Sequence, residues 1–246
     1  MYTYAKYSAL LFAPTFCLIA ILIAPSPGHG QISASGFGAF KFELKEPVLP
    51  VSDEVLQDEI QYITEVQQQI ETGDLWSVKY WNNSYPAYHW HQLLMRASQN
   101  HKGHKNGGRV AILHLAVYDA TVEVWKHKQA HSRKAAYQYD QSVKRLVQEP
   151  EYSTFICEWS AAAGAAHQVI GYYFPEQQDM LDSHLVAFKS ARLATGLVFP
   201  SDIEKGLKIG RKIADQYIEY AKTDRTERRW EGQVPQADSL WSGNPS

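Results

Sequence analysis

The amino-acid sequence predicts an all-α protein built as a helical bundle, and three observations lead to that prediction. Apolar residues recur every three or four positions in several segments, which is the spacing of an amphipathic helix. No segment of the sequence shows the convincing apolar–polar alternation of a strand. Residues 161–166 are alanine and glycine alone, and side chains this small are typical of a helix that another backbone approaches closely.

The predicted helices begin and end at recognisable residues. The first follows Ser52, an N-cap residue, and carries carboxylates in its first turn, where the helix dipole favours them. The last follows Pro200, where Ser201 and Glu204 have the S-x-x-E spacing of a capping box. Gly206 and Gly210 let this last helix accept a close neighbour. Between these ends, apolar spacing predicts helices over 88–97, 109–127, 160–174 and 177–196, and residues 128–152 are weakly patterned.

The N-terminus has the pattern of an export signal. Lys6 precedes an apolar run over 8–24, and small residues Gly28 and Gly30 follow it. Residues 1–30 are therefore predicted to be a signal peptide that delivers the protein to the periplasm or the medium. A retained membrane anchor is the alternative, because the apolar run is near the short limit for spanning a bilayer. Residues 31–50 then read as an extended linker and residues 51–246 as a single domain.

Charge and composition exclude several classes of function. The formal net charge is −2, so we expect no nucleic-acid partner and no membrane contact except through the N-terminal segment. Only Cys157 remains if the signal peptide is removed, which leaves no internal disulfide. The 10 histidines show no spacing that would converge three or four ligands, so no metal site is predicted. His89 and His91, two residues apart, point to different sides of a helix.

Short motifs follow one another in a fixed order between residues 76 and 241. They are Tyr80-Trp81-Asn82, Tyr118-Asp119-Ala120, the small-residue run before Phe174-Pro175, Pro200-Ser201-Asp202 with Gly210, and Trp230 to Trp241. In this order they resemble the PAP2 superfamily, in particular the soluble helical branch shared by bacterial acid phosphatases and vanadium-dependent haloperoxidases. The resemblance implies a helical bundle of that type, with phosphoester hydrolysis or vanadate-dependent halide oxidation as the family activity.

Members of that superfamily hold phosphate or vanadate with a lysine and arginines that neutralise the oxyanion. The resemblance gives four anion-binding candidates, among which the first two compete for one role: Lys126, Lys128, Arg133 and Arg192. It also implies that Asp202 is the supporting carboxylate, which in the family holds the reactive histidine. A small oxyanion or phosphoester is the ligand that such a cluster would take.

The reactive positions of the family carry inert residues here. The motif serines fall on Cys157 and Ala191, and the motif histidines fall on Trp159 and Val198. Valine forms no bond to phosphorus or vanadium, and an indole N–H does not deliver a proton at neutral pH. Catalysis is therefore predicted to be lost or strongly impaired, with no cofactor expected and phosphate as a weak ligand.

Two alternatives remain open at this stage. One is a working phosphatase or haloperoxidase with replacement residues, for example Cys157 as a thiolate nucleophile. The other is a non-catalytic interaction module, in which Trp159 and the aromatic residues of 76–90 form a binding surface. Family members continue well beyond the segment near Trp241, so the resemblance implies a shortened form. Such a form would expose apolar surface that a protein partner or a second copy covers.

Overall fold

The structure is a computed structural model that describes residues 52–70, 75–99, 106–131, 133–148 and 153–223. These ranges contain helices and no strand, which confirms the predicted all-α class. The helices are α1 (Asp53–Gln69), α2 (Leu75–Asn82), α3 (Pro86–Ser98), α4 (Asn106–Ala130), α5 (Glu158–Tyr173), α6 (Gln178–Ala194) and α7 (Pro200–Ala221), with short 3-10 turns η1 (Ala136–Gln138) and η2 (Pro175–Gln177).

Three predicted features lie outside the described residues: the signal peptide, the linker over 31–50 and the segment containing Trp230 and Trp241. Within the described ranges, no helix is both long and apolar enough to cross a bilayer.

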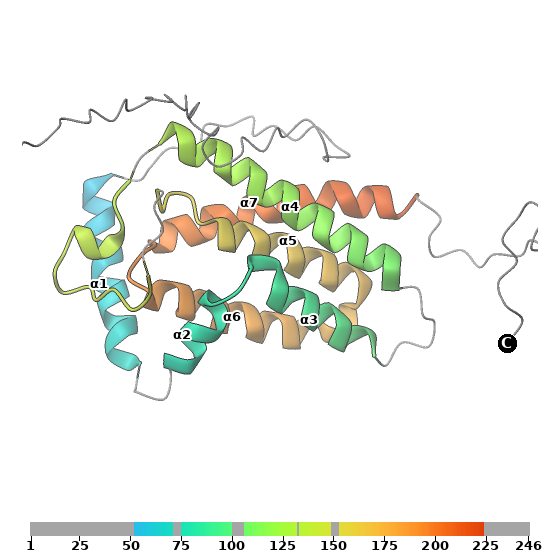
Figure 1. Ribbon diagram of the computed structural model, residues 1–246, viewed down its shortest axis with the longest axis horizontal. Coiled ribbons are helices and arrows are strands. Elements are labelled where there is room, and N and C mark those ends of the chain that lie inside the picture. Colours follow the sequence, from blue (N-terminus) through green and yellow to red (C-terminus); the bar gives the residue numbers. More distant parts are fainter. Residues whose placement is uncertain (1–51, 71–74, 100–105, 132, 149–152, 224–246) are drawn as a thin grey trace, which may run out of the picture. The chain divides into compact units, whose positions relative to one another are not determined.

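Close contact between α5 and α7 lies at the centre of the helix packing. Helices α4, α5 and α7 pack against one another (Figure 1). A Cβ atom added to Gly210 would lie 2.0 Å from the carbonyl oxygen of Ala161, and one added to Gly164 would lie 2.3 Å from that of Leu207. Larger side chains at these positions would therefore force the two backbones apart. The small residues of 161–166 and the glycines of α7 serve the close approach that the sequence predicts.

The other helices surround this centre and bury the large aromatic side chains. Helix α3 packs on α4 and α5, α2 packs on α6, and α1 packs on α6 and α7. Trp81 of α2 and Trp90 of α3 are buried and lie within ring contact of each other and of Phe188 on α6. These ring contacts link α2, α3 and α6 within the hydrophobic core.

The predicted capping box at the start of α7 is wrong. The helix begins at Pro200, a position that proline favours because the first helical residue needs no N–H partner. The Asp202 carboxylate, at the third helical position, accepts a hydrogen bond of 3.2 Å from the backbone N–H of Phe199. Ser201 instead donates its hydroxyl to Glu59 of α1, at 2.9 Å. The cap is thus formed by Asp202 rather than by Ser201 and Glu204.

Two other predicted boundaries also shift. Helix α4 continues to Ala130, so the start of the weakly patterned stretch at 128–152 is helical. Helix α5 begins at Glu158, directly after Cys157 at its N-cap. Both shifts place candidate residues on helices, namely Lys128 at the end of α4 and Trp159 at the start of α5.

Candidate functional site

The segment over 133–147 is fastened to the turn between α6 and α7, and this fastening positions Arg133. The backbone N–H of Tyr137 donates to the carbonyl of Gly196 at 2.9 Å. Gly196 has a φ of 72°, the left-handed region that glycine adopts without strain. A Cβ atom there would also lie only 2.3 Å from the carbonyl oxygen of Lys144. Glycine at this turn therefore allows the segment that carries Arg133 to lie against the start of α7.

Arg133 and Asp202 form an ion pair in the interior. Both side chains are buried, and the guanidinium lies over the rings of Phe155 and Phe199, with its Cζ atom 4.8 and 4.6 Å from their centroids. Burial raises the pKa of Asp202 to about 6, because removal from water outweighs the attraction of Arg133 and the hydrogen bond from Phe199. The carboxylate is therefore ionised at pH 7, where Arg133 and the N–H of Phe199 stabilise its charge.

A second buried pair joins the end of α4 to the start of α5. Lys128 places its Nζ atom 3.0 Å from a carboxylate oxygen of Glu158 and donates to the carbonyl of Ser153 at 2.7 Å. Burial by itself would raise the pKa of Glu158, but the charges of Lys128 and then Arg192 outweigh it and hold this pKa below its usual value. Glu158 is thus an anion that two cations stabilise.

Arg192, near the C-terminal end of α6, has partners on α2 and at the start of α5. It is buried, and its Nη1 donates to the side-chain oxygen of Asn82 on α2. Its Nη2 lies 3.8 Å from the sulfur of Cys157, and its Cζ lies 5.3 Å from the ring centroid of Trp159. The indole therefore covers one face of the guanidinium, where cation–π attraction favours it.

The structure separates the competing lysine candidates. Lys128 belongs to the buried cluster, whereas Lys126 is half exposed and pairs with Glu123 on its own helix at 2.8 Å. Ala191 and Val198, the remaining predicted positions, are buried in the hydrophobic core. These interactions form two groups: Arg133 with Asp202, and Lys128, Glu158 and Arg192 with Cys157, Trp159 and Asn82. We call the two groups together the buried charge cluster.

Asn82, like Glu158, is a member of the cluster to which the sequence assigned no role. It ends α2, more than a hundred residues before Arg192, and its amide also donates to the backbone carbonyls of Val78 and Ala191. The sequence offered one indication, since Asn82 closes the Tyr80-Trp81-Asn82 motif. Motif position alone did not reveal that its side chain reaches α6.

The aromatic residues of 76–90 divide between the core and the surface. Trp81 and Trp90 are buried, while Trp76 and Tyr85 are 69% and 84% exposed. Trp76 stacks on Tyr80 with their ring centroids 4.9 Å apart. Only some of the aromatic residues in the predicted binding surface are therefore exposed, among them Trp76 and Tyr85. Trp159 lies over Arg192 instead.

The described histidines take several different roles. His127 lies 3.7 Å from a carboxylate oxygen of Glu123, and the Nδ1 of His131 lies 3.2 Å from the carbonyl oxygen of His127. His101 and His104 lie outside the described residues. Among the residues that the structure does describe, no three side chains of histidine, cysteine, aspartate or glutamate converge on one point.

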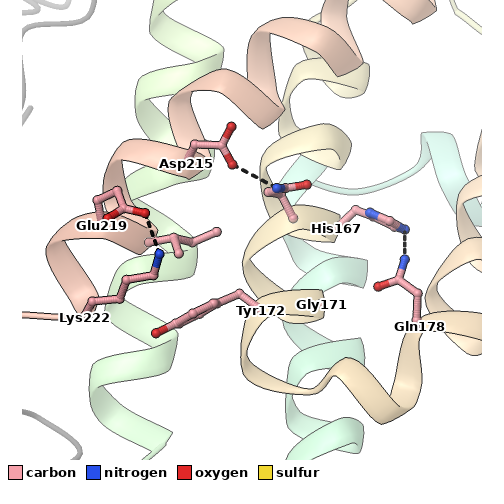
Figure 2. Close-up of a pocket in the computed structure, with 9 residues that line it drawn as sticks. His167, Gly171, Tyr172, Gln178, Asp215, Glu219 and Lys222 are labelled. Atoms are coloured by element: carbon pink, nitrogen blue, oxygen red, sulfur yellow. Dashed lines mark hydrogen bonds and ion pairs between the residues drawn. The ribbon is translucent and has the colours of Figure 1, made fainter.

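His167 of α5 is a buried histidine with hydrogen-bond partners. Its Nε2 lies 2.7 Å from a carboxylate oxygen of Asp182 and 3.4 Å from the amide nitrogen of Gln178. It lines a surface hollow of about 400 Å³ between α5, the start of α6 and the end of α7 (Figure 2). Asp215 and Glu219 line this hollow and already have partners, since Asp215 accepts a hydrogen bond from Gln168 and Glu219 forms an ion pair with Lys222. None of the residues lining it belongs to the buried charge cluster.

Comparison with known proteins identifies the fold. No protein-family model matches the sequence, and no curated protein matches it. Among solved structures, a bacterial vanadium-dependent iodoperoxidase is similar, with a TM-score of 0.58 and 18% sequence identity over 71% of this chain and 52% of that one. The fold is therefore that of the helical vanadium haloperoxidases. The chain spans about half the length of that structure.

Proposed function

We propose that this chain is an exported, non-catalytic protein with a haloperoxidase-like helical fold, and that its buried charge cluster stabilises the fold rather than binding an oxyanion. The observation that carries the proposal is the contact between Arg133 and Asp202. The family resemblance assigns Asp202 to hold a reactive histidine, and Val198 stands in place of that histidine. Asp202 is paired instead with one of the arginines that would neutralise the anion.

Compensation of charge argues against an anion in the cluster. The positive charges of Lys128 and Arg133 are matched by Glu158 and Asp202 at contact distance. A phosphate or vanadate placed here would have to displace these carboxylates or meet their repulsion in a region of low dielectric. The residues present do not fit vanadate, because no histidine stands at the position implied for its ligand and two of the three cations, Lys128 and Arg133, are already paired.

The side chains at the reactive positions also argue against turnover. Val198 has no lone pair to offer phosphorus or vanadium, and Trp159 lies over Arg192 where a general acid would act. Cys157, the replacement nucleophile considered from the sequence, is fully buried. A substrate phosphorus would have no path to its sulfur without opening the helix packing.

Turnover assays test the proposal directly. The full-length chain is assayed with p-nitrophenyl phosphate, and separately with vanadate, peroxide and iodide or bromide. We expect both rates to equal those of Cys157→Ala and Arg192→Met in the same assays, with a bacterial acid phosphatase as the positive control. A rate above background that either substitution abolishes would overturn the proposal and establish an enzyme with replacement residues.

Thermal unfolding tests the state of the cluster independently of turnover. A ligand at a hundred times its dissociation constant stabilises a protein by about 2.7 kcal/mol, which would raise the Tm by several degrees. We expect no such rise with millimolar phosphate or vanadate. A rise that Arg192→Met removes would show that the cluster binds oxyanions, and would contradict a purely structural role even if no turnover is seen.

Export is tested by the N-terminal sequence of the protein recovered from its native cell. The positively charged start, apolar run and small residues before Gln31 support cleavage near that residue. We expect the envelope or medium fraction to contain a chain that begins near Gln31. An intact N-terminus in the membrane fraction would support the retained anchor instead.

A further inference from the structure

Two histidines on neighbouring helices direct their ring nitrogens at each other. His91 lies on α3 and His114 lies on α4, and the Nδ1 atom of His91 is 3.0 Å from the Nε2 atom of His114. The ring centroids are 5.2 Å apart and the planes are tilted by 40°. His114 is exposed and His91 is partly exposed, so water reaches the pair.

This nitrogen–nitrogen distance suits two ligands of one metal ion. Imidazole nitrogen binds transition metals at about 2.0–2.1 Å. Two such bonds place the nitrogens about 2.9 Å apart at a right angle and about 3.4 Å apart at the tetrahedral angle. The observed 3.0 Å lies between these limits. The separation therefore needs to change by only a few tenths of an ångström, and each ring must also turn so that both lone pairs point at the ion.

The helices hold the two rings in this arrangement. Helices α3 and α4 pack against each other, and both also pack on α5. His91 and His114 lie near the middle of their helices rather than in connecting loops. Because the backbone already fixes both ligands, the second ring binds at a high effective concentration once the first has bound.

In the absence of metal, one ring donates its N–H to the lone pair of the other. Metal binding requires a lone pair on both facing nitrogens, so the donor ring must move its proton to its opposite nitrogen. A neutral imidazole can do this because its two tautomers carry the proton on different nitrogens. No net proton is gained or lost by the pair, and solvent water fills the remaining positions on the ion.

We propose that His91 and His114 form a surface binding site for one divalent transition-metal ion of the class that imidazole favours, namely Zn²⁺, Ni²⁺ or Cu²⁺. The site bridges α3 and α4 and is separate from the buried charge cluster. It was not predicted from the sequence because its ligands are 23 positions apart and neither belongs to a metal-binding motif. The inference does not depend on the proposed function.

Copper and zinc titrations of the full-length chain test this site. Calorimetry with Zn²⁺ should give one site per chain, and the electron paramagnetic resonance spectrum with one equivalent of Cu²⁺ should show coupling to two nitrogens. His91→Ala and His114→Ala should each raise the dissociation constant about 100-fold, because one ring loses the chelating partner. Circular dichroism checks that each variant keeps its helices.

The matched control is the double variant His101→Ala, His104→Ala. It removes two histidines that lie in the sequence between α3 and α4 and leaves His91 and His114 in place. Binding in this variant should equal that of the wild type. Loss of binding there, or its retention in His91→Ala and His114→Ala, would overturn the proposal. Failure of the wild type to bind either ion would overturn it as well.

Discussion

Arg133 and Asp202 form a buried ion pair that ties the segment before α5 to the first turn of α7. The guanidinium contacts Asp202 on one side and lies over the rings of Phe155 and Phe199. Asp202 also accepts the backbone N–H of Phe199, so one carboxylate both caps α7 and holds Arg133. The family resemblance assigns Arg133 to an external anion, but in this structure its positive charge is paired with a carboxylate of the protein itself.

Removal of Arg133 should destabilise the protein because it leaves Asp202 buried without its cation. We expect Arg133→Met to lower the free energy of unfolding by about 3 kcal/mol at pH 7, measured by urea denaturation. Adding Asp202→Asn to this variant should recover most of the loss, since the unpaired carboxylate is gone. The control Lys189→Met breaks the partly exposed pair with Glu204 and should cost less than about 1 kcal/mol. Equal losses in the two methionine variants would contradict this account.

The raised pKa of Asp202 predicts how stability changes with pH. A carboxyl group whose pKa is about 6 in the folded state and 3.8 in the unfolded state retains its proton longer when folded. Its contribution therefore favours folding at low pH and is lost as the pH rises from about 4 to about 6. We expect the free energy of unfolding of the wild type, relative to that of Asp202→Asn, to rise by about 1 kcal/mol between pH 7 and pH 5. A difference that stays constant, or falls, would refute the raised pKa.

Glu158 should show the opposite behaviour because its pKa is lowered. Its charge stabilises the fold above the unfolded value of 4.5, and that contribution is lost as the pH falls through the folded pKa. Glu158→Gln removes the carboxylate from Lys128, whose side chain is 2% exposed. We expect a loss of about 3 kcal/mol at pH 7 that shrinks in acid. The exposed carboxylate of Asp58 supplies the control, since Asp58→Asn should change stability by less than about 0.5 kcal/mol.

Gly210 should tolerate no side chain because its Cβ position faces backbone. Gly210→Ala would place a methyl group 2.0 Å from the carbonyl oxygen of Ala161. We expect a loss of about 1–3 kcal/mol as α5 and α7 separate, measured by thermal or urea unfolding. Gly107→Ala is the matched control, since no atom lies within 4 Å of its added Cβ. It should be neutral or stabilising by up to about 1 kcal/mol. If both substitutions had the same effect, close packing would not be the reason for Gly210.

Much of the helix arrangement could be predicted because it depends on the local spacing of apolar residues and on side-chain size. Leu56, Ile60 and Ile63 recur at helical spacing on α1 and are all buried. The alanine run of α5 indicated a close neighbour before that neighbour was known to be α7. The Ser201–Glu204 cap was wrong because Pro200 begins the helix two residues earlier, which moves Asp202 into the capping position.

The candidate site was less predictable because its partners are distant in the chain. Family resemblance supplied Lys128, Arg133, Arg192 and Asp202 as candidates, but not the pairs that they form. The resemblance could not decide between Lys126 and Lys128. In the structure Lys126 is half exposed, whereas Lys128 is buried against Glu158. The contacts of Asn82 with Arg192 and of His91 with His114 could not be predicted, because each depends on how two helices pack together.

The sequence by itself determined that the chain is helical and where the close helix contact lies. These properties depend on periodicity, side-chain size and chemical type, which are local. Only the tertiary structure decided that Arg133 is paired with Asp202 and Lys128 with Glu158. Whether a buried charge is compensated depends on which side chains the fold brings within a few ångströms, because Coulomb attraction in a region of low dielectric is decided by distance.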